Sequence, residues 1–120
     1  MSRAIVDAAY CVHANLGAGL LESVYEQCLA AELAFRNILV ERQVRLPIVY
    51  RNIKIYAGFR LDLLVEKLVV VEIKAVERIL PVHEAQLLTY LKLSDHRLGL
   101  LVNFNVTRIK DGLRRLVHSR

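Results

Sequence analysis

Two acidic residues and a lysine near the middle of the chain have a spacing that could support metal-dependent phosphate chemistry. Asp62 precedes Glu72 by ten residues, and Lys74 follows Glu72 by two. Carboxylates are ligands that Mg²⁺ and Mn²⁺ prefer, and a neighbouring lysine can orient a water molecule and stabilise charge that develops on a phosphate. These side chains can act together only if the elements that carry them lie side by side.

The segments around these residues have the pattern of a β-hairpin. Residues 58–66 and 68–76 are almost contiguous, and side chains in a strand alternate between its two faces. Matching the apolar faces fixes the register. The predicted pairs are Val65 with Val69, Leu63 with Val71, and Leu61 with Ile73. This register places Asp62 directly opposite Glu72.

Such a pairing brings like charges together. Directly opposed residues have Cβ atoms about 4.5–5.5 Å apart, where two carboxylates repel each other. A divalent cation would offset the repulsion, with the carboxylates, a backbone carbonyl and waters as its oxygen ligands. The same register sets Arg60 opposite Lys74 on the same face. The alternative, a solvated strand face, is disfavoured because Val70 and Val76 share this face and a helix is expected to cover part of it.

Apolar periodicity predicts the elements on either side of the hairpin. Helical spacing covers residues 2–15 and 20–36, with a glycine turn between them, and β-branched residues dominate residues 40–56. A helix over residues 83–93 and a strand over residues 98–104 follow the hairpin. The tail from Thr107 has no clear period, and Pro81 suits a first helical turn. The predicted fold is a single α/β domain over residues 1–120.

Composition agrees with a domain whose strands are covered on both faces. Hydrophobic residues make up 55% of the 120 residues, and the mean hydropathy is +0.34. No apolar run approaches the ~20 residues that a membrane span needs, and Asp7 comes too early for a secretory signal. We therefore expect a cytoplasmic protein without membrane contact. Cys11 and Cys28 fall in helical apolar patterns and are expected to be free thiols. The net charge of +5 favours a polyanionic partner without identifying it.

The order of elements and the acidic residues resemble the PDDEXK nuclease superfamily. Asp62 matches the motif acid, with Leu61 where many members have proline, and residues 72–74 (Glu-Ile-Lys) match the E-x-K element. The resemblance implies a restriction-endonuclease-like αβββαβ core, with a mixed central sheet flanked by helices. It also implies hydrolysis of DNA that depends on Mg²⁺ or Mn²⁺.

A second match lies in the helix after the hairpin. Residues 86–90 (Gln-Leu-Leu-Thr-Tyr) resemble the Q-x-x-x-Y element of nuclease domains in bacterial recombination helicases. Residues four apart lie on one helix face, so Gln86 and Tyr90 can both point towards the strand pair. The resemblance implies that Gln86 bonds a catalytic group or the substrate, and that Tyr90 contacts the substrate or braces the site.

The third match is in the helix over residues 20–36. Residues 19–25 (Gly-Leu-Leu-Glu-Ser-Val-Tyr) carry the signature of the GxxExxY family of PDDEXK-like proteins, and the resemblance extends over nearly the whole chain. Glu22 matches the first-helix acid that supports the metal in several branches of the superfamily. The alternative for Glu22 is that it is an exposed helix carboxylate without a function in metal binding. The alternative for Tyr25 is that it only packs in the core.

Together these patterns predict a metal-dependent phosphodiesterase that hydrolyses DNA through a metal-activated water. The predicted metal ligands are Glu22, Asp62 and Glu72, and the predicted catalytic residues are Asp62, Glu72, Lys74, Gln86 and Tyr90. The alternative function is a nucleic-acid-binding or assembly module that keeps the fold without cutting. A homodimer is a further expectation, although no feature of the sequence locates its interface.

Overall fold

Helices and strands follow one another much as their apolar periodicity predicts. The computed structural model describes residues 1–56 and 58–119. Its elements are α1 (Ser2–Leu16), α2 (Glu22–Phe35), β1 (Val40–Arg45), β2 (Ile48–Tyr50), β3 (Ile53–Ile55), β4 (Arg60–Val65), β5 (Val69–Lys74), α3 (Pro81–Ser94), β6 (Leu98–Asn103), the 3₁₀ helix η1 (Ile109–Gly112) and β7 (Leu113–Val117). None of the described helices is both long and apolar enough to cross a membrane.

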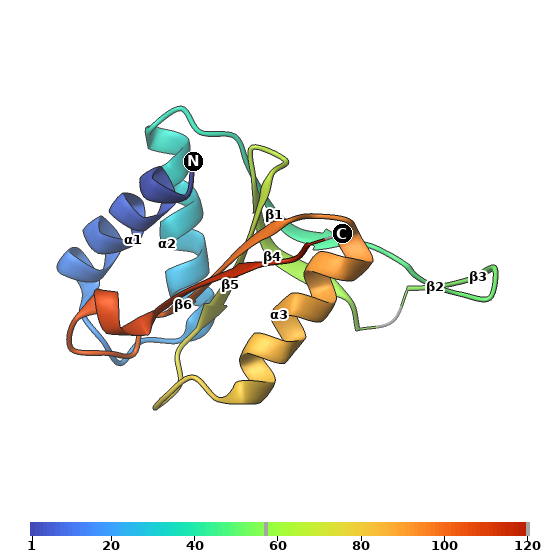
Figure 1. Ribbon diagram of the computed structural model, residues 1–120. Helices are drawn as coiled ribbons and strands as arrows, with labels where there is room; N and C mark the ends of the chain where they lie inside the picture. Colours follow the sequence, from blue (N-terminus) through green and yellow to red (C-terminus); the bar gives the residue numbers. More distant parts are fainter. Residues whose placement is uncertain (57, 120) are drawn as a thin grey trace.

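A mixed five-stranded sheet forms the centre of the molecule. The strand order is β1-β4-β5-β6-β7, with β5 and β6 parallel and the other neighbours antiparallel. Parallel strands need a crossover connection, and α3 supplies it between β5 and β6 (Figure 1). This arrangement confirms the predicted α/β class with a restriction-endonuclease-like core.

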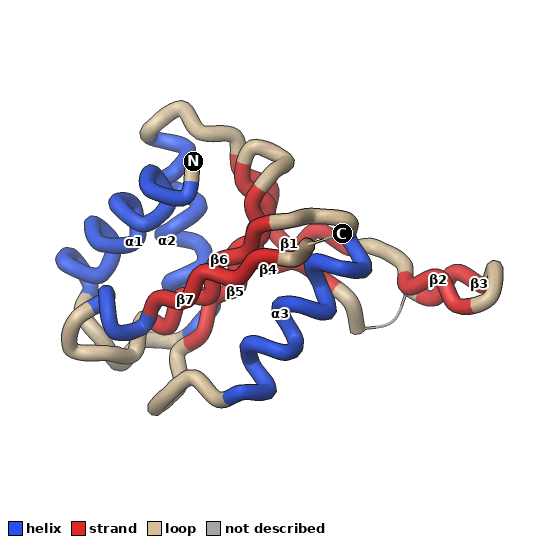
Figure 2. Tube along the Cα trace, viewed as in Figure 1, coloured by secondary structure: helices blue, strands red, loops and turns tan. Residues whose placement is uncertain are grey.

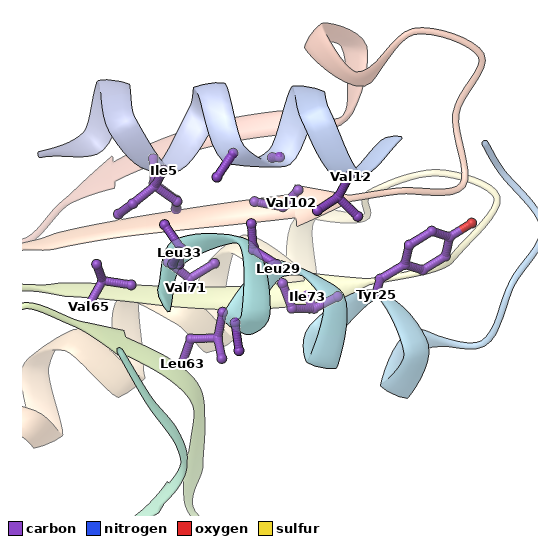
Figure 3. Packing of buried hydrophobic residues seen from close by; sticks show 14 of the residues in the cluster. Ile5, Val12, Tyr25, Leu29, Leu33, Leu63, Val65, Val71, Ile73 and Val102 are labelled. Carbon is purple, nitrogen blue, oxygen red and sulfur yellow. The ribbon is translucent and has the colours of Figure 1, made fainter. Parts of the chain in front are cut away.

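Helices cover both faces of the sheet. The pair α1 and α2 lies on one face and α3 on the other (Figure 2). The larger apolar cluster fills the space between α1, α2 and the sheet, where Leu29 and Leu33 of α2 meet Val71 and Ile73 of β5 (Figure 3). A second cluster lies under α3 and consists of Phe59, Leu61, Leu64, Val70, Leu87, Leu91 and Leu101. Strands buried on both sides account for the high apolar content of the chain.

The structure corrects the expectation for the tail. The tail contains β7, which pairs with β6, although the sequence pattern gives no strand there. Its residues are half-buried or exposed, so an edge position leaves no regular alternation to detect. Strands β2 and β3, in the stretch where β-branched residues dominate, form a separate two-stranded hairpin outside the central sheet.

The two cysteines are free thiols, as predicted. Both Cys11 and Cys28 are half-buried, in α1 and α2 respectively.

Tyr25 fixes the glycine turn that leads into α2. Its hydroxyl donates to the carbonyl oxygen of Gly17 at 2.6 Å and accepts the backbone N–H of Leu20 at 3.1 Å. Its fully buried ring stacks on Phe104, with ring centroids 4.6 Å apart. The tyrosine of the G-x-x-E-x-x-Y pattern therefore packs in the core and hydrogen-bonds the glycine turn. This turn sets the position of Glu22.

Tyr25→Phe is expected to destabilise the protein without changing its fold. The substitution leaves the half-buried carbonyl of Gly17 and the N–H group of Leu20 without their partner, which costs about 1 kcal/mol. We expect the midpoint of thermal unfolding, measured by circular dichroism, to fall by roughly 4–8 °C. Tyr10→Phe is the matched control because Tyr10 is 44% exposed. An unchanged midpoint in Tyr25→Phe would contradict this role.

Candidate active site

A polar cavity of about 400 Å³ opens where β4 and β5 separate, between the start of α2 and the middle of α3. It is lined by Glu22, Ser23, Glu26, Gln43, Gly58, Arg60, Asp62, Glu72, Lys74, Gln86 and Tyr90. All six residues predicted from the sequence are among them. The fold thus brings residues of the helices α2 and α3 and of the strands β1, β4 and β5 to one cavity.

The carboxylates of Asp62 and Glu72 replace the backbone pairing at this point. The ladder between β4 and β5 ends at the pair Leu63 and Val71. Beyond it, the N–H of Asp62 donates to Glu72 Oε2 at 2.9 Å, and the N–H of Ile73 donates to Asp62 Oδ2 at 2.9 Å. Each acid therefore takes the place of a carbonyl of its own strand and holds the other strand's backbone.

The predicted register is right up to this point and wrong beyond it. Leu61 and Ile73 do not pair, because the carboxylates of Asp62 and Glu72 occupy the position of the next ladder bonds. Leu61 belongs to the apolar cluster under α3, whereas Leu63 belongs to the cluster under α2. Simple alternation predicts that Leu61 and Leu63 lie on the same face, and this prediction is wrong because they belong to different clusters.

Gln43 distorts the strand on the other side of Asp62. In the register of β1 with β4, Arg42 pairs with Leu63 and Val44 with Leu61, and the position between them is Gln43. Gln43 has a φ of 51°, which strains a residue other than glycine. Its Nε2 donates to Glu26 Oε1 at 2.6 Å. The strands on both sides of β4 thus depart from regular pairing at Asp62, which leaves room for the cavity.

Glu26 is the residue of this wall that sequence reasoning missed. It is 6% exposed, and Oε2 accepts from Arg42 Nη2 at 3.1 Å and Nε at 3.3 Å. Its signal in the sequence is its position four residues after Glu22, which puts both on one helix face. Arg42 forms an ion pair with Glu26, and Gln43 donates a hydrogen bond to it. The role of Glu26 in the cavity wall is therefore to fix β1 against α2.

Burial and repulsion make the ionised form of Glu72 unfavourable. Glu72 is 5% exposed, and its burial, together with the charge of Asp62, raises its pKa to about 8. The backbone N–H of Asp62 and the charge of Lys74 act in the opposite direction. A bound cation would remove this penalty, because it would favour both carboxylates in their charged forms.

Glu22 lies within the electric field of the same groups. Burial raises the pKa of Glu22, and Asp62 and Glu26 raise it further, whereas Lys74 and the backbone N–H of Ala75 lower it. Within residues 1–56 and 58–119, no three His, Cys, Asp or Glu side chains are close enough together to hold a metal ion by themselves. The ligand set of Glu22, Asp62 and Glu72 therefore stays a prediction.

The donor chemistry nevertheless fits a hard divalent cation. The strand-to-strand bonds use one oxygen of Asp62 and one of Glu72. The second oxygen of each carboxylate takes no part in these strand-to-strand bonds, and both side chains line the cavity. Two carboxylate oxygens with space for water match the preference of Mg²⁺ and Mn²⁺.

Gln86 and Tyr90 form one unit on the wall that α3 contributes. Gln86 Nε2 donates to the hydroxyl of Tyr90 at 3.0 Å. The ring of Tyr90 meets Phe59 edge to face, with centroids 4.8 Å apart. Burial and the charge of Glu72 raise the pKa of Tyr90. The i,i+4 spacing thus brings both residues to the cavity, where Gln86 orients the tyrosine hydroxyl.

Two other polar residues, His83 and Asn103, have structural roles. The Nδ1 atom of His83 accepts the N–H of Leu80 at 2.9 Å and so caps α3 outside the cavity. Asn103 is buried and bonds both backbone groups of Val76, with its Oδ1 also accepting from the N–H of Asn105. Asn103 therefore fixes the chain two residues beyond Lys74.

Comparison with known proteins agrees with this geometry. The family model for the PD-(D/E)XK nuclease superfamily matches residues 1–116. No curated protein and no solved structure matches the chain significantly. The match leaves the GxxExxY group as a prediction from residues 19–25. Since the match covers nearly the full length and the motif acids line one cavity, the chain belongs to the PD-(D/E)XK nuclease superfamily.

Proposed function

We propose that the protein is a deoxyribonuclease that hydrolyses phosphodiester bonds in DNA with Mg²⁺ or Mn²⁺. The observation that carries the proposal is the placement of Asp62, Glu72 and Lys74 in one cavity, with one oxygen of each carboxylate outside the strand-to-strand bonds. An acidic pair of this kind costs stability, and a binding module that does not cut has no need of it.

Each residue has a role that follows from its chemistry. Asp62 and Glu72 would hold the metal ion, with Glu22 as an additional ligand, and the bound ion would supply a hydroxide nucleophile and polarise the phosphate. Lys74 orients the attacking water and stabilises negative charge on the phosphate. The Gln86 and Tyr90 pair contacts the substrate from α3.

The test is metal-dependent cleavage by the purified protein. Labelled single-stranded, duplex and branched DNA are incubated with Mg²⁺, Mn²⁺ or EDTA, and products are separated on denaturing gels. The doubly substituted Asp62→Ala, Glu72→Gln protein is the control for contaminating nucleases. We expect cleavage by the wild type that requires the metal and is absent from the control. No cleavage of any substrate, or equal cleavage by both proteins, would overturn the proposal.

A further inference from the structure

The β2–β3 hairpin stands apart from the rest of the molecule. It extends away from the central sheet and its covering helices (Figure 1). A two-stranded hairpin in water is marginally stable, and this one pairs with no strand of the central sheet. Ile48 packs at its base against the apolar cluster under α3, which anchors the hairpin to the domain. We call residues 48–55 the arm.

Large apolar side chains are exposed on both faces of the arm. Val49, Tyr50 and Ile53 are 60%, 61% and 60% exposed. Tyr50 pairs with Ile53 on one face, whereas Val49 pairs with Lys54 on the other. A partner protein docked on one side would cover one face and leave the other in water. A groove that encloses the arm would cover both of its apolar faces.

The charge around the arm has a single sign. Residues 42–61 contain Arg42, Arg45, Arg51, Lys54 and Arg60 and no Asp or Glu. In the part of the chain that the structure describes, Arg42 is the one member of this set that forms an ion pair, with Glu26. The other four cations are available to a polyanion.

The same charge disfavours a second copy of the chain as the partner. A two-fold contact between two arms would set Arg51 and Lys54 of one copy against the same residues of the other. No acidic residue in the arm would compensate this repulsion.

The tip of the arm carries side chains that can contact base edges. Arg51 and Asn52 occupy the two turn positions, with φ values of 48° and 71°, so the turn is tight and the arm is narrow. Arginine pairs with guanine and asparagine with adenine in the major groove, and that groove admits a two-stranded ribbon. Three residues per strand give a length of about 10 Å, comparable to the depth of the groove.

The arm also lies next to the candidate active site in the chain. Gly58 and Arg60, which line the cavity, follow the end of β3 by three and five residues. A duplex held by the arm would therefore present its backbone near Asp62, which is two residues beyond Arg60.

We propose that the β2–β3 arm enters the major groove of duplex DNA and holds the duplex against the cavity. The proposal rests on the nuclease function proposed above for the choice of DNA as the ligand. Arg51 and Asn52 contact base edges, Lys54 contacts phosphate, and Tyr50 and Ile53 cover apolar groove surface. The arm makes the protein prefer duplex to single-stranded DNA.

The test combines Arg51→Asn with Asn52→Gly. Asn-Gly is the preferred sequence for this type of turn, so the double variant keeps the hairpin and removes the tip side chains. Binding to a labelled 20-base-pair duplex is measured by fluorescence anisotropy in EDTA. We expect the dissociation constant to rise about tenfold or more, with a smaller change for a single strand of the same sequence. Lys110→Gln in η1 is the control and keeps wild-type affinity.

Lys54→Gln provides a second measurement that does not depend on the turn. We expect the slope of log affinity against log salt concentration to become shallower by about one unit, because one phosphate contact is lost. Unchanged duplex affinity in both variants overturns the proposal. So does a shift from dimer to monomer in the tip variant, measured by light scattering, with duplex affinity unchanged, since the arm would then bind a second copy.

Hydrolysis of a small phosphodiester, bis(p-nitrophenyl) phosphate, separates this proposal from the nuclease function. The arm has no role with so small a substrate, so the arm variants keep wild-type rates if the cavity is catalytic. If neither DNA nor the diester is hydrolysed but the arm variants lose duplex affinity, the nuclease function fails and the arm proposal stands. If both substrates are hydrolysed and duplex affinity does not change in the arm variants, the nuclease function stands and the arm proposal fails.

Discussion

Replacing Lys74 by methionine is expected to lower the rate of metal-dependent DNA cleavage by about 10²–10³-fold. The side chain lines the cavity with Asp62 and Glu72, and its positive charge would stabilise the phosphate as negative charge develops. Methionine keeps the length of the side chain and removes the charge. Because Lys74 is not a metal ligand, we expect the affinity for Mn²⁺, measured by calorimetry, to stay the same or increase slightly.

Asp62→Asn separates the role of the acid from that of the lysine. This variant should lose both cleavage and Mn²⁺ affinity, because asparagine keeps the size of the side chain and removes the negative charge that attracts the ion. Lys67→Met is the matched control, because Lys67 follows β4 at the opposite end of the hairpin and pairs with Glu41 at 3.3 Å. Wild-type cleavage in Lys74→Met would remove the lysine from the mechanism. Equal loss of Mn²⁺ affinity in Lys74→Met and Asp62→Asn would assign the two residues the same role.

The stability of the metal-free protein is expected to fall as pH rises from about 4.5 to about 8, because of Glu72. The folded protein holds the proton of Glu72 up to a pKa of about 8, whereas the ordinary pKa of a glutamate is 4.5. Between these values the folded state binds more protons than the unfolded state, so the free energy of unfolding decreases with pH. The loss due to this group is at most about 5 kcal/mol, at about 1.4 kcal/mol per pKa unit, and is nearly complete about one pH unit above the folded pKa.

Glu72→Gln isolates this contribution from that of other titrating groups. We expect urea unfolding in EDTA to show a wild-type stability that falls, relative to Glu72→Gln, as pH rises from 5 to 8.5. Glu41→Gln, a substitution in the surface ion pair with Lys67, should follow the wild type. Adding Mn²⁺ at pH 8.5 should raise the free energy of unfolding of the wild type substantially and that of Glu72→Gln only slightly. Parallel curves for wild type and Glu72→Gln would contradict the assignment.

Local pattern was sufficient to predict the helices, most strands and the identity of the central acids. Apolar residues at helical spacing mark α1 and α2, and two alternating runs mark β4 and β5. The register of these runs follows from the need to bury one face, so the ladder up to Leu63 and Val71, and the approach of Asp62 to Glu72 just beyond it, could be predicted without a structure. The i,i+4 spacing of Gln86 and Tyr90 likewise sufficed to place both on one helix face.

Tertiary structure decided how the strands separate. The ladder of β4 and β5 ends because the carboxylates of Asp62 and Glu72 accept the N–H groups of Ile73 and Asp62. This exchange depends on side-chain atoms that no alternation pattern represents. The strained Gln43 opens the other side of β4, and it is held there by Glu26 of the preceding helix α2. Such contacts depend on how the neighbouring elements pack, so the residue pattern along the chain carries no signal for them.

The three residues that suggested phosphate chemistry illustrate both contributions. Residue type and spacing determined that Asp62, Glu72 and Lys74 share one side of a hairpin, because strands alternate with a period of two. Only the folded chain buried Glu72, raised its pKa and placed Glu22 in the same field, because burial and charge proximity depend on α2 and α3 packing over the strands. The position of the β2–β3 arm outside the sheet is also a tertiary outcome, since its sequence alternates like that of any strand.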